Sequence, residues 1–163
     1  MLDIQFATEN DIPAIRQIAH ITWQNTYRHI ITSLQMDMML EEMYSSEALL
    51  QQFKSGDRFA KAIFKDQILG FVSFRNATDS PTTIFISKLY VLTKTHGLGM
   101  GKSLIEFVSN IALQEKKTQI ELNVNRYNKA LYFYRRNGFY IHQSIDRPYH
   151  QFELNDYVMR KFL

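Results

Sequence analysis

THGLGMGKS, residues 95–103, places three glycines in alternation directly before a segment with helical periodicity. Glycine has no Cβ, so this backbone can adopt unusual angles and approach a ligand closely. The apolar residues between Leu104 and Ala112 recur with the helical period, which predicts that a helix begins here. Its free N–H groups and positive dipole end, with Lys102 and Ser103 nearby, form an anion site suited to a pyrophosphate.

Three other interpretations of this turn fit the residues less well. A nucleotide-binding P-loop needs a glycine five residues before the tail 101–103, where this chain has His96. A dinucleotide-binding GxGxxG pattern needs glycine at 97, 99 and 102, but position 102 is Lys. A tight strand-to-helix connection that binds nothing would be expected for a lone glycine pair, but not for three alternating glycines. Binding of a nucleoside triphosphate stays an alternative, and it predicts protection by ATP with magnesium rather than by coenzyme A.

The segments around the turn predict alternating strands and helices. The run Thr83–Leu92, rich in β-branched and aromatic residues, is a strand that leads into the turn. After the helix come a strand at Thr118–Asn125 and a helix near Asn128–Arg136 that ends at Asn-Gly. Two strands, roughly Phe139–Ser144 and Phe152–Lys161, finish the chain.

The first half of the chain predicts a strand, three helices and a hairpin. A strand at Ile4–Ala7 precedes the capping residues 8–11, which open an amphipathic first helix. The other predicted elements are helices at Leu34–Tyr44 and Ser46–Phe53, and a hairpin of strands Arg58–Lys65 and Ile68–Phe74 with its turn at Asp66-Gln67. The order is β-α-α-α-β-β-β-α-β-α-β-β. Because no repeat or Pro/Gly-rich linker interrupts it, we expect residues 1–163 to form a single domain.

Composition excludes several classes of function. The 163 residues contain no cysteine, so disulfides, thiolate catalysis and Cys-ligated zinc are excluded. Five scattered histidines lack the spacing of metal ligands, so we expect no metal site. The formal charge of +3 comes from mixed charges without a basic block, which argues against a nucleic-acid partner. No apolar run approaches the roughly 20 residues that span a bilayer, and no secretory pattern opens the chain. We therefore expect a cytoplasmic protein with no membrane partner.

A second motif lies downstream, where residues 130–139 read ALYFYRRNGF with Asn128 ahead of them. With it, the sequence resembles the GNAT superfamily of N-acetyltransferases. The family signature Gln/Arg-x-x-Gly-x-Gly/Ala is matched by residues 96–101, with His96 in place of the usual Gln or Arg. The second signature, Asn then Ala-x-x-Phe-Tyr-x-x-x-Gly-Phe, is matched in order, with Asn128 one residue closer to Ala130 than in many members. The opening Ile4–Asp11 also looks like the family, so the resemblance covers nearly the whole chain.

The resemblance implies an α/β (α+β) GNAT fold. Its central sheet is mixed and mostly antiparallel, has about seven strands, is flanked by helices and is splayed between strands 4 and 5. It also implies acetyl-CoA as co-substrate, with the pantetheine arm paired to a strand and the pyrophosphate on the glycine turn. The residues implied in co-substrate binding are Leu89, Tyr90, Val91, His96, Gly97, Leu98, Gly99, Met100, Gly101, Lys102, Ser103 and Asn128.

Tyr134 matches the family tyrosine whose phenol gives a proton to the leaving sulfur. Without the motif, packing of this ring with Phe133 and Phe139 would be the preferred interpretation. The general base stays unassigned, because the fourth strand has Ile86-Ser87-Lys88 where some members carry an acid. Glu121, Asn123 or a water chain could take the proton from the amine.

The acceptor is expected to be an amine of a small molecule or a peptide. The resemblance implies that the segment with Trp23 and Tyr27 borders the acceptor pocket. Glu121 and Asn123 are the other two candidate residues for binding the acceptor. That segment and the ending Asn155–Met159 are similar to relatives of polyamine acetyltransferases. The alternative is a GNAT-fold sensor or interaction module that binds acyl-CoA or a partner without turnover. The sequence leaves the acyl-chain preference open, and the choice between monomer and homodimer.

Overall fold

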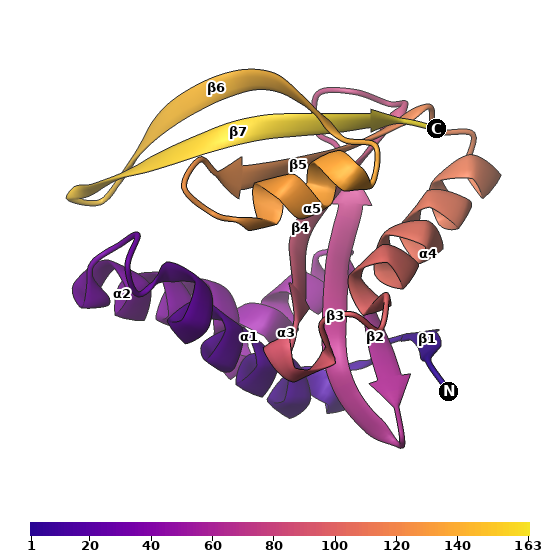
Figure 1. Cartoon of the computed structure of the whole chain (residues 1–163), viewed down its shortest axis with the longest axis horizontal. Helices are drawn as coiled ribbons and strands as arrows, with labels where there is room; N and C mark the ends of the chain where they lie inside the picture. The colour runs from indigo at the N-terminus through magenta and orange to yellow at the C-terminus, as the bar shows by residue number, and fades with distance from the viewer.

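A computed structural model describes residues 1–163 and contains one twisted sheet with helices on both faces (Figure 1). The seven strands lie in the order β1-β2-β3-β4-β5-β7-β6, and β4 with β5 is the only parallel pair. The strands are β1 (Asp3–Phe6), β2 (Arg58–Phe64), β3 (Gln67–Asn76), β4 (Thr83–Val91), β5 (Gln119–Asn125), β6 (Tyr140–Tyr149) and β7 (Phe152–Phe162). The helices are α1 (Ile12–Tyr27), α2 (Ser33–Tyr44), α3 (Ser46–Lys54), α4 (Met100–Gln114) and α5 (Ala130–Arg136), with 3-10 turns η1 (Glu9–Asp11) and η2 (Thr93–Thr95). The predicted mixed, mostly antiparallel sheet is confirmed.

The sheet opens between β4 and β5. These strands pair only from Thr83 with Gln119 to Ile86 with Leu122. At that point a register shift in the β3–β4 ladder leaves Ser87 without a partner on β3, so β4 bends. Beyond the bulge, β4 stays with β3 while β5 stays with β7, and the two halves of the sheet diverge (Figure 1). The predicted splay is confirmed.

Each face of the sheet has its own apolar cluster. On β5, Ile120, Leu122 and Val124 alternate with half-buried polar residues, so one face of the strand packs inward. They join a cluster with the buried side of α4, whereas α1, α2 and α3 pack on the opposite face of the first half of the sheet (Figure 1). The second cluster includes Trp23 and Tyr44, both almost fully buried. The two layers hold β4 between them and leave its free end at the opening.

Local capping explains where two of the helices begin. The Thr32 hydroxyl accepts a hydrogen bond from the Gln35 amide at 3.2 Å, and α2 begins at Ser33. The Ser45 hydroxyl accepts from the Ala48 amide at 3.1 Å, and α3 follows directly. Two short connected helices can therefore pack beside α1, which positions one wall of the site.

Two sequence predictions on strands were wrong in their bounds. The first hairpin turns at Lys65-Asp66, with φ of 49° and 61°, and Gln67 already pairs with Phe64. A two-residue hairpin loop needs left-handed backbone that matches the strand twist, and Asp tolerates it although no glycine marks it. Strand β6 does not end at Ser144 but runs to Tyr149, because it pairs with β7 along its length. Pro148 fits there because β6 is the edge strand.

Candidate active site

The glycine turn has a separate structural reason for each glycine. Gly97 and Gly99 have φ of 93° and 72°, a left-handed backbone that other residues rarely adopt, and Gly99 is the cap before α4. A Cβ on Gly101 would lie 2.8 Å from Cζ of Phe133, so any other residue here requires the Phe133 ring or one of the two helices to move. The first amide that bonds back to the cap is that of Ser103, to the Gly99 carbonyl at 2.9 Å. The preceding amides at the start of α4 have no partner within the helix, and such amides can bind an anion.

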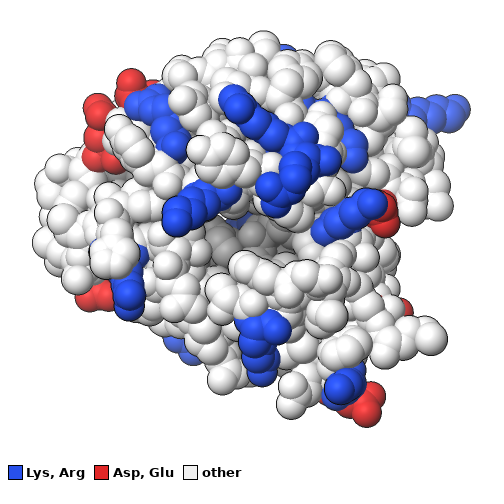
Figure 2. All heavy atoms as spheres, viewed as in Figure 1, with Lys and Arg blue, Asp and Glu red and all other residues white.

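Basic side chains gather on the face of the molecule that carries α5. Figure 2 shows Lys and Arg side chains gathered over α5 and around a hollow in this face of the molecule. Lys129, Arg135 and Arg136 are exposed on and beside α5, and Lys94 and Lys102 are exposed on the turn and at the start of α4. Together with the α4 dipole they create a positive field over the hollow, which favours a ligand with several phosphates.

The end of β4 presents an unpaired edge. Leu89, Tyr90 and Val91 pair with β3 on one side, through Val72, Phe71 and Gly70. Their other side has no partner, because β5 has already diverged. An extended ligand with amide groups can add to such an edge as another strand would. This geometry supports the predicted pairing of Leu89–Val91 with a pantetheine arm.

Tyr134 is on α5 and is only 8% exposed. Its ring packs edge-to-face on Phe133 and Phe139, with centroids 5.4 and 5.6 Å away, so the ring is part of the core. The hydroxyl makes no hydrogen bond within the protein, yet it is not among the fully buried polar atoms that lack a partner. Burial, with a smaller effect from Tyr27, raises the pKa of Tyr134 well above its usual range. The phenol therefore stays protonated, as a proton donor must be.

Asn128 connects the two halves of the opening. Its Nδ2 donates to the Tyr27 hydroxyl at 3.3 Å, and its Oδ1 accepts from the Ala130 amide at 2.9 Å. Tyr27 in turn packs on Trp23, with centroids 4.6 Å apart. Burial raises the pKa values of Tyr27 and Tyr90, which keeps both phenols neutral. Asn128 therefore orders the protein around the opening, whatever it contributes to the co-substrate.

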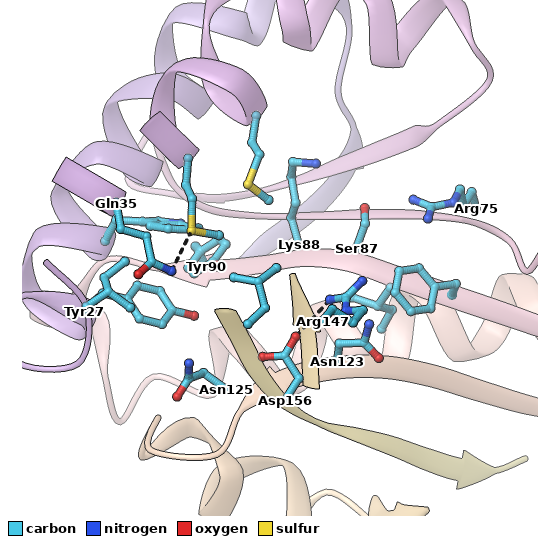
Figure 3. Close-up of a pocket in the computed structure, with 17 residues that line it drawn as sticks. Tyr27, Gln35, Arg75, Ser87, Lys88, Tyr90, Asn123, Asn125, Arg147 and Asp156 are labelled. Carbon is cyan, nitrogen blue, oxygen red and sulfur yellow. Dashed lines mark hydrogen bonds and ion pairs between the residues drawn. The ribbon is translucent and has the colours of Figure 1, made fainter. Parts of the chain in front are cut away.

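A cavity of about 320 Å³ lies between α1, α2 and the two halves of the sheet (Figure 3). Of the predicted site residues, it brings together Trp23, Tyr27, Tyr90 and Asn123. The remaining lining residues are Ile31, Gln35, Met39, Met43, Arg75, Phe85, Ile86, Ser87, Lys88, Asn125, Arg147, Leu154 and Asp156.

Glu121 does not line this cavity. It is two residues before Asn123 on β5, but its carboxylate accepts a hydrogen bond from Arg160 Nε at 2.8 Å in a half-buried ion pair. That pairing removes the geometric reason for Glu121 as acceptor residue or base.

No cluster of three or more His, Asp or Glu side chains is placed as metal ligands would be. No helix is long and apolar enough to cross a membrane.

Four charged residues of the cavity were not predicted from the sequence, namely Arg75, Lys88, Arg147 and Asp156. Lys88 is 7% exposed, and burial, opposed by Asp57 and assisted by Arg75, lowers its pKa to about 8. Arg147 Nη2 lies 3.0 Å from Asp156 Oδ2. Among these four, only Lys88 has a signal in the sequence, since it is a lysine inside an apolar strand. Arg75, Arg147 and Asp156 come from β3, β6 and β7, and no sequence pattern indicates that these strands meet.

Several known proteins are similar to this chain in sequence or in fold. The chain is 21% identical to a spermidine N(1)-acetyltransferase of Thermoplasma acidophilum, over 98% of this chain and 96% of that protein. The crystal structure of the PaiA N-acetyltransferase of T. acidophilum in complex with coenzyme A has a TM-score of 0.84 and 22% identity, covering 100% of this chain and 99% of the other. A GCN5-related N-acetyltransferase structure from Rhodopseudomonas palustris has a TM-score of 0.82 and 17% identity, covering 99% and 95%.

The family itself is indicated by a direct match to the sequence. The model of the acetyltransferase (GNAT) domain matches residues 27–151, which span most of the chain and include the glycine turn, the splayed strands and α5. That match, on a sheet opened where the two sequence motifs meet, makes this protein a member of the GNAT family of N-acetyltransferases.

Proposed function

We propose that this protein transfers the acetyl group of acetyl-CoA to a primary amine of a small molecule or peptide, by direct attack in a ternary complex. The observation that carries the proposal is the position of Tyr90. Its backbone belongs to the open edge of β4 next to the glycine turn, and its side chain lines the cavity. A thioester held on that edge would therefore meet an amine held in the cavity.

The chemistry needs few protein groups. The neutral amine nitrogen attacks the thioester carbonyl carbon, the C–S bond breaks, and the thiolate needs a proton. Tyr134 is suited to donate it, because burial keeps its hydroxyl protonated. The proton of the attacking amine leaves through the cavity, where Asn123 and Asn125 can hold a water. The products are an acetamide and free coenzyme A, and no covalent enzyme intermediate is needed.

The first test is protection of the fold by ligands. Thermal unfolding is measured with coenzyme A, acetyl-CoA and ATP-magnesium, since a ligand at 100 times its dissociation constant adds roughly 2.7 kcal/mol to a two-state fold. We expect a rise with both coenzyme A forms and none with ATP-magnesium. Protection by ATP-magnesium alone would revive the nucleotide interpretation of the turn.

Two glycine variants localise that effect. Gly97 and Gly56 have φ of 93° and 96°, and an added Cβ meets no atom within 4 Å at either position. Gly97→Ala and Gly56→Ala should therefore strain the backbone similarly, by roughly 1–2 kcal/mol. Only Gly97→Ala should weaken coenzyme A binding, because Gly97 is in the turn. Equal effects of the two variants on binding would place the co-substrate elsewhere.

Turnover is then tested with a panel of amines, by the release of free thiol from acetyl-CoA. Spermidine belongs in the panel, because the similar T. acidophilum protein is a spermidine N(1)-acetyltransferase. Binding of coenzyme A without turnover of any amine would favour a sensor.

We also propose that residues 1–163 act as one domain, supported by a single sheet that runs from Asp3 to Phe162. One unfolding transition, shifted as a whole by coenzyme A, is the expected result.

A further inference from the structure

The charges inside the cavity are unbalanced. It is lined by three cations, Arg75, Lys88 and Arg147, and by one carboxylate, Asp156. Arg147 is paired with that carboxylate at 3.0 Å. No ion pair of the protein includes Arg75 or Lys88. Two positive side chains therefore line the cavity without an ion pair, although the more distant Asp57 partly offsets the charge of Lys88.

The two cations rest on aromatic rings instead of carboxylates. The guanidinium carbon of Arg75 lies 4.8 Å from the centroid of the Phe85 ring, and Lys88 Nζ lies 5.5 Å from the centroid of the Tyr44 ring. Such contacts position a cation and leave its hydrogen-bond donors free. Lys88 lines the cavity, and its Nζ is not among the polar side-chain atoms that are buried without a partner.

A buried, unpaired ammonium is unfavourable for a fold unless something compensates it. Lys88 is 7% exposed, and burial lowers its pKa. An apolar residue at this position would extend the neighbouring cluster of Phe71 and Tyr90 at no such cost. Packing alone therefore favours an apolar residue here, yet the chain has a lysine. An anion bound in the cavity would offset the charge of this lysine.

The cations are also placed where a substrate could reach them. In Figure 3, Lys88, Ser87 and Arg75 follow one another along the β3–β4 side of the cavity, and Asn123, Arg147 and Asp156 lie on the opposite side. Tyr90 is two residues beyond Lys88 on the same strand, toward the open edge of β4. A small molecule with its amine near Tyr90 can therefore place a second group on Lys88 and Arg75.

Resting on the proposed function, we propose that the acceptor is an amine that also carries a carboxylate, and that Lys88 and Arg75 bind this carboxylate. Free amino acids and short peptides share that chemistry. Polyamines do not, and their several positive charges would meet like charges in the cavity. Lys88 and Arg75 are then the residues that determine acceptor specificity.

The experiment compares matched acceptors on the full chain. Each common amino acid is assayed beside its C-terminal amide, together with dipeptides, putrescine, spermidine and spermine, by release of free coenzyme A. We expect a free carboxylate compound to be the best acceptor and its amide to have a kcat/KM at least 10-fold lower. Dipeptides distinguish the two sources of the carboxylate, since a cavity fitted to free amino acids rejects the longer chain.

Variants separate a specificity role from a structural one. Lys88→Met and Arg75→Gln should each raise KM for the carboxylate acceptor by roughly 10- to 100-fold, the size of a lost charge-assisted hydrogen bond. The KM for the amide should change less than about 3-fold. The control is Lys54→Met, an exposed lysine at the end of α3, which should leave both KM values unchanged. The coenzyme A affinity, measured in the same variants, should stay constant.

The outcomes distinguish this inference from the function on which it rests. A polyamine or neutral amine that outperforms every carboxylate acceptor overturns the inference and leaves the acetyltransferase proposal in place. An equal KM increase for acid and amide in both variants overturns it too, because it would show a structural effect. No binding of coenzyme A and no turnover of any amine overturns the proposed function itself, and this inference with it.

Discussion

Asn128 and Tyr27 are 101 positions apart, yet their side chains meet across the open end of the sheet, with Asn128 Nδ2 donating to the Tyr27 hydroxyl at 3.3 Å. The same Asn128 accepts from the Ala130 amide at 2.9 Å, where α5 begins. One side chain thereby ties a wall of the cavity to the helix that positions Tyr134. A substitution of Asn128 should therefore change both stability and catalysis.

Asn128→Ala removes both hydrogen bonds, whereas Asn128→Asp keeps the acceptor for the Ala130 amide. We expect the alanine variant to lower the free energy of unfolding by about 1–2 kcal/mol, the usual value of two partly buried hydrogen bonds. The aspartate variant should lose less than half of that. Denaturant unfolding measures both. Equal losses would mean that the hydrogen bond from the Ala130 amide contributes nothing, contrary to the geometry.

Tyr134→Phe removes only the hydroxyl. Because that hydroxyl makes no hydrogen bond in the protein, the free energy of unfolding should change by less than about 0.5 kcal/mol. If the phenol protonates the leaving thiolate, kcat should fall by roughly 100-fold or more while coenzyme A affinity is retained. Tyr132→Phe is the matched control, on the same helix with a 60% exposed ring. Unchanged kcat in Tyr134→Phe would leave the ring with its packing role alone.

Gly101→Ala tests the close contact between α4 and α5. The new Cβ would lie 2.8 Å from Phe133 Cζ, so a helix must shift or the ring must rotate. Overpacking of this kind typically costs about 1–3 kcal/mol, and it should also weaken coenzyme A binding because the turn moves. Phe133→Leu removes the contacting ring carbons. The double variant Gly101→Ala with Phe133→Leu should therefore be more stable than the sum of the single effects predicts, and simple additivity would argue against the clash.

Lys88→Met tests the cost of the buried ammonium. Burial lowers the pKa of Lys88 from 10.5 to about 8, with Asp57 raising it and Arg75 lowering it, while the ring of Tyr44 lies beside Nζ. At pH 7 the folded wild-type protein must therefore bury a charge, and the variant should be more stable by about 3 kcal/mol.

The pH dependence of that difference has a definite sign. Between pH 8 and 10.5 the folded state has released the Lys88 proton while the unfolded state still binds it, so wild-type stability rises relative to Lys88→Met. The stability difference between the two proteins should shrink across this window. Denaturant unfolding of both proteins from pH 7 to 10.5 measures it. A difference that stays constant with pH would show that Lys88 is not the titrating group.

The order of strands and helices could be predicted because each signal is local. Thr32 and Ser45 cap helices by bonding amides three residues away, and Gly97 and Gly99 are needed for their own φ angles. The ends of strands that depend on pairing with another strand could not be predicted as well. The turn at Lys65-Asp66 and the extension of β6 to Tyr149 are set by partner strands, whose register no local pattern specifies.

By itself, the sequence determined the family, the order of the elements and the glycine turn, since short-range backbone geometry and motif spacing are written along the chain. Tertiary structure alone decided which side chains share the cavity. Arg75, Lys88 and Asp156 come from three strands, and Glu121 is taken out of the site by Arg160, which lies on the same strand as Asp156. Charge balance in a cavity is a sum over residues distant in sequence, so it exists only once the sheet has formed and opened.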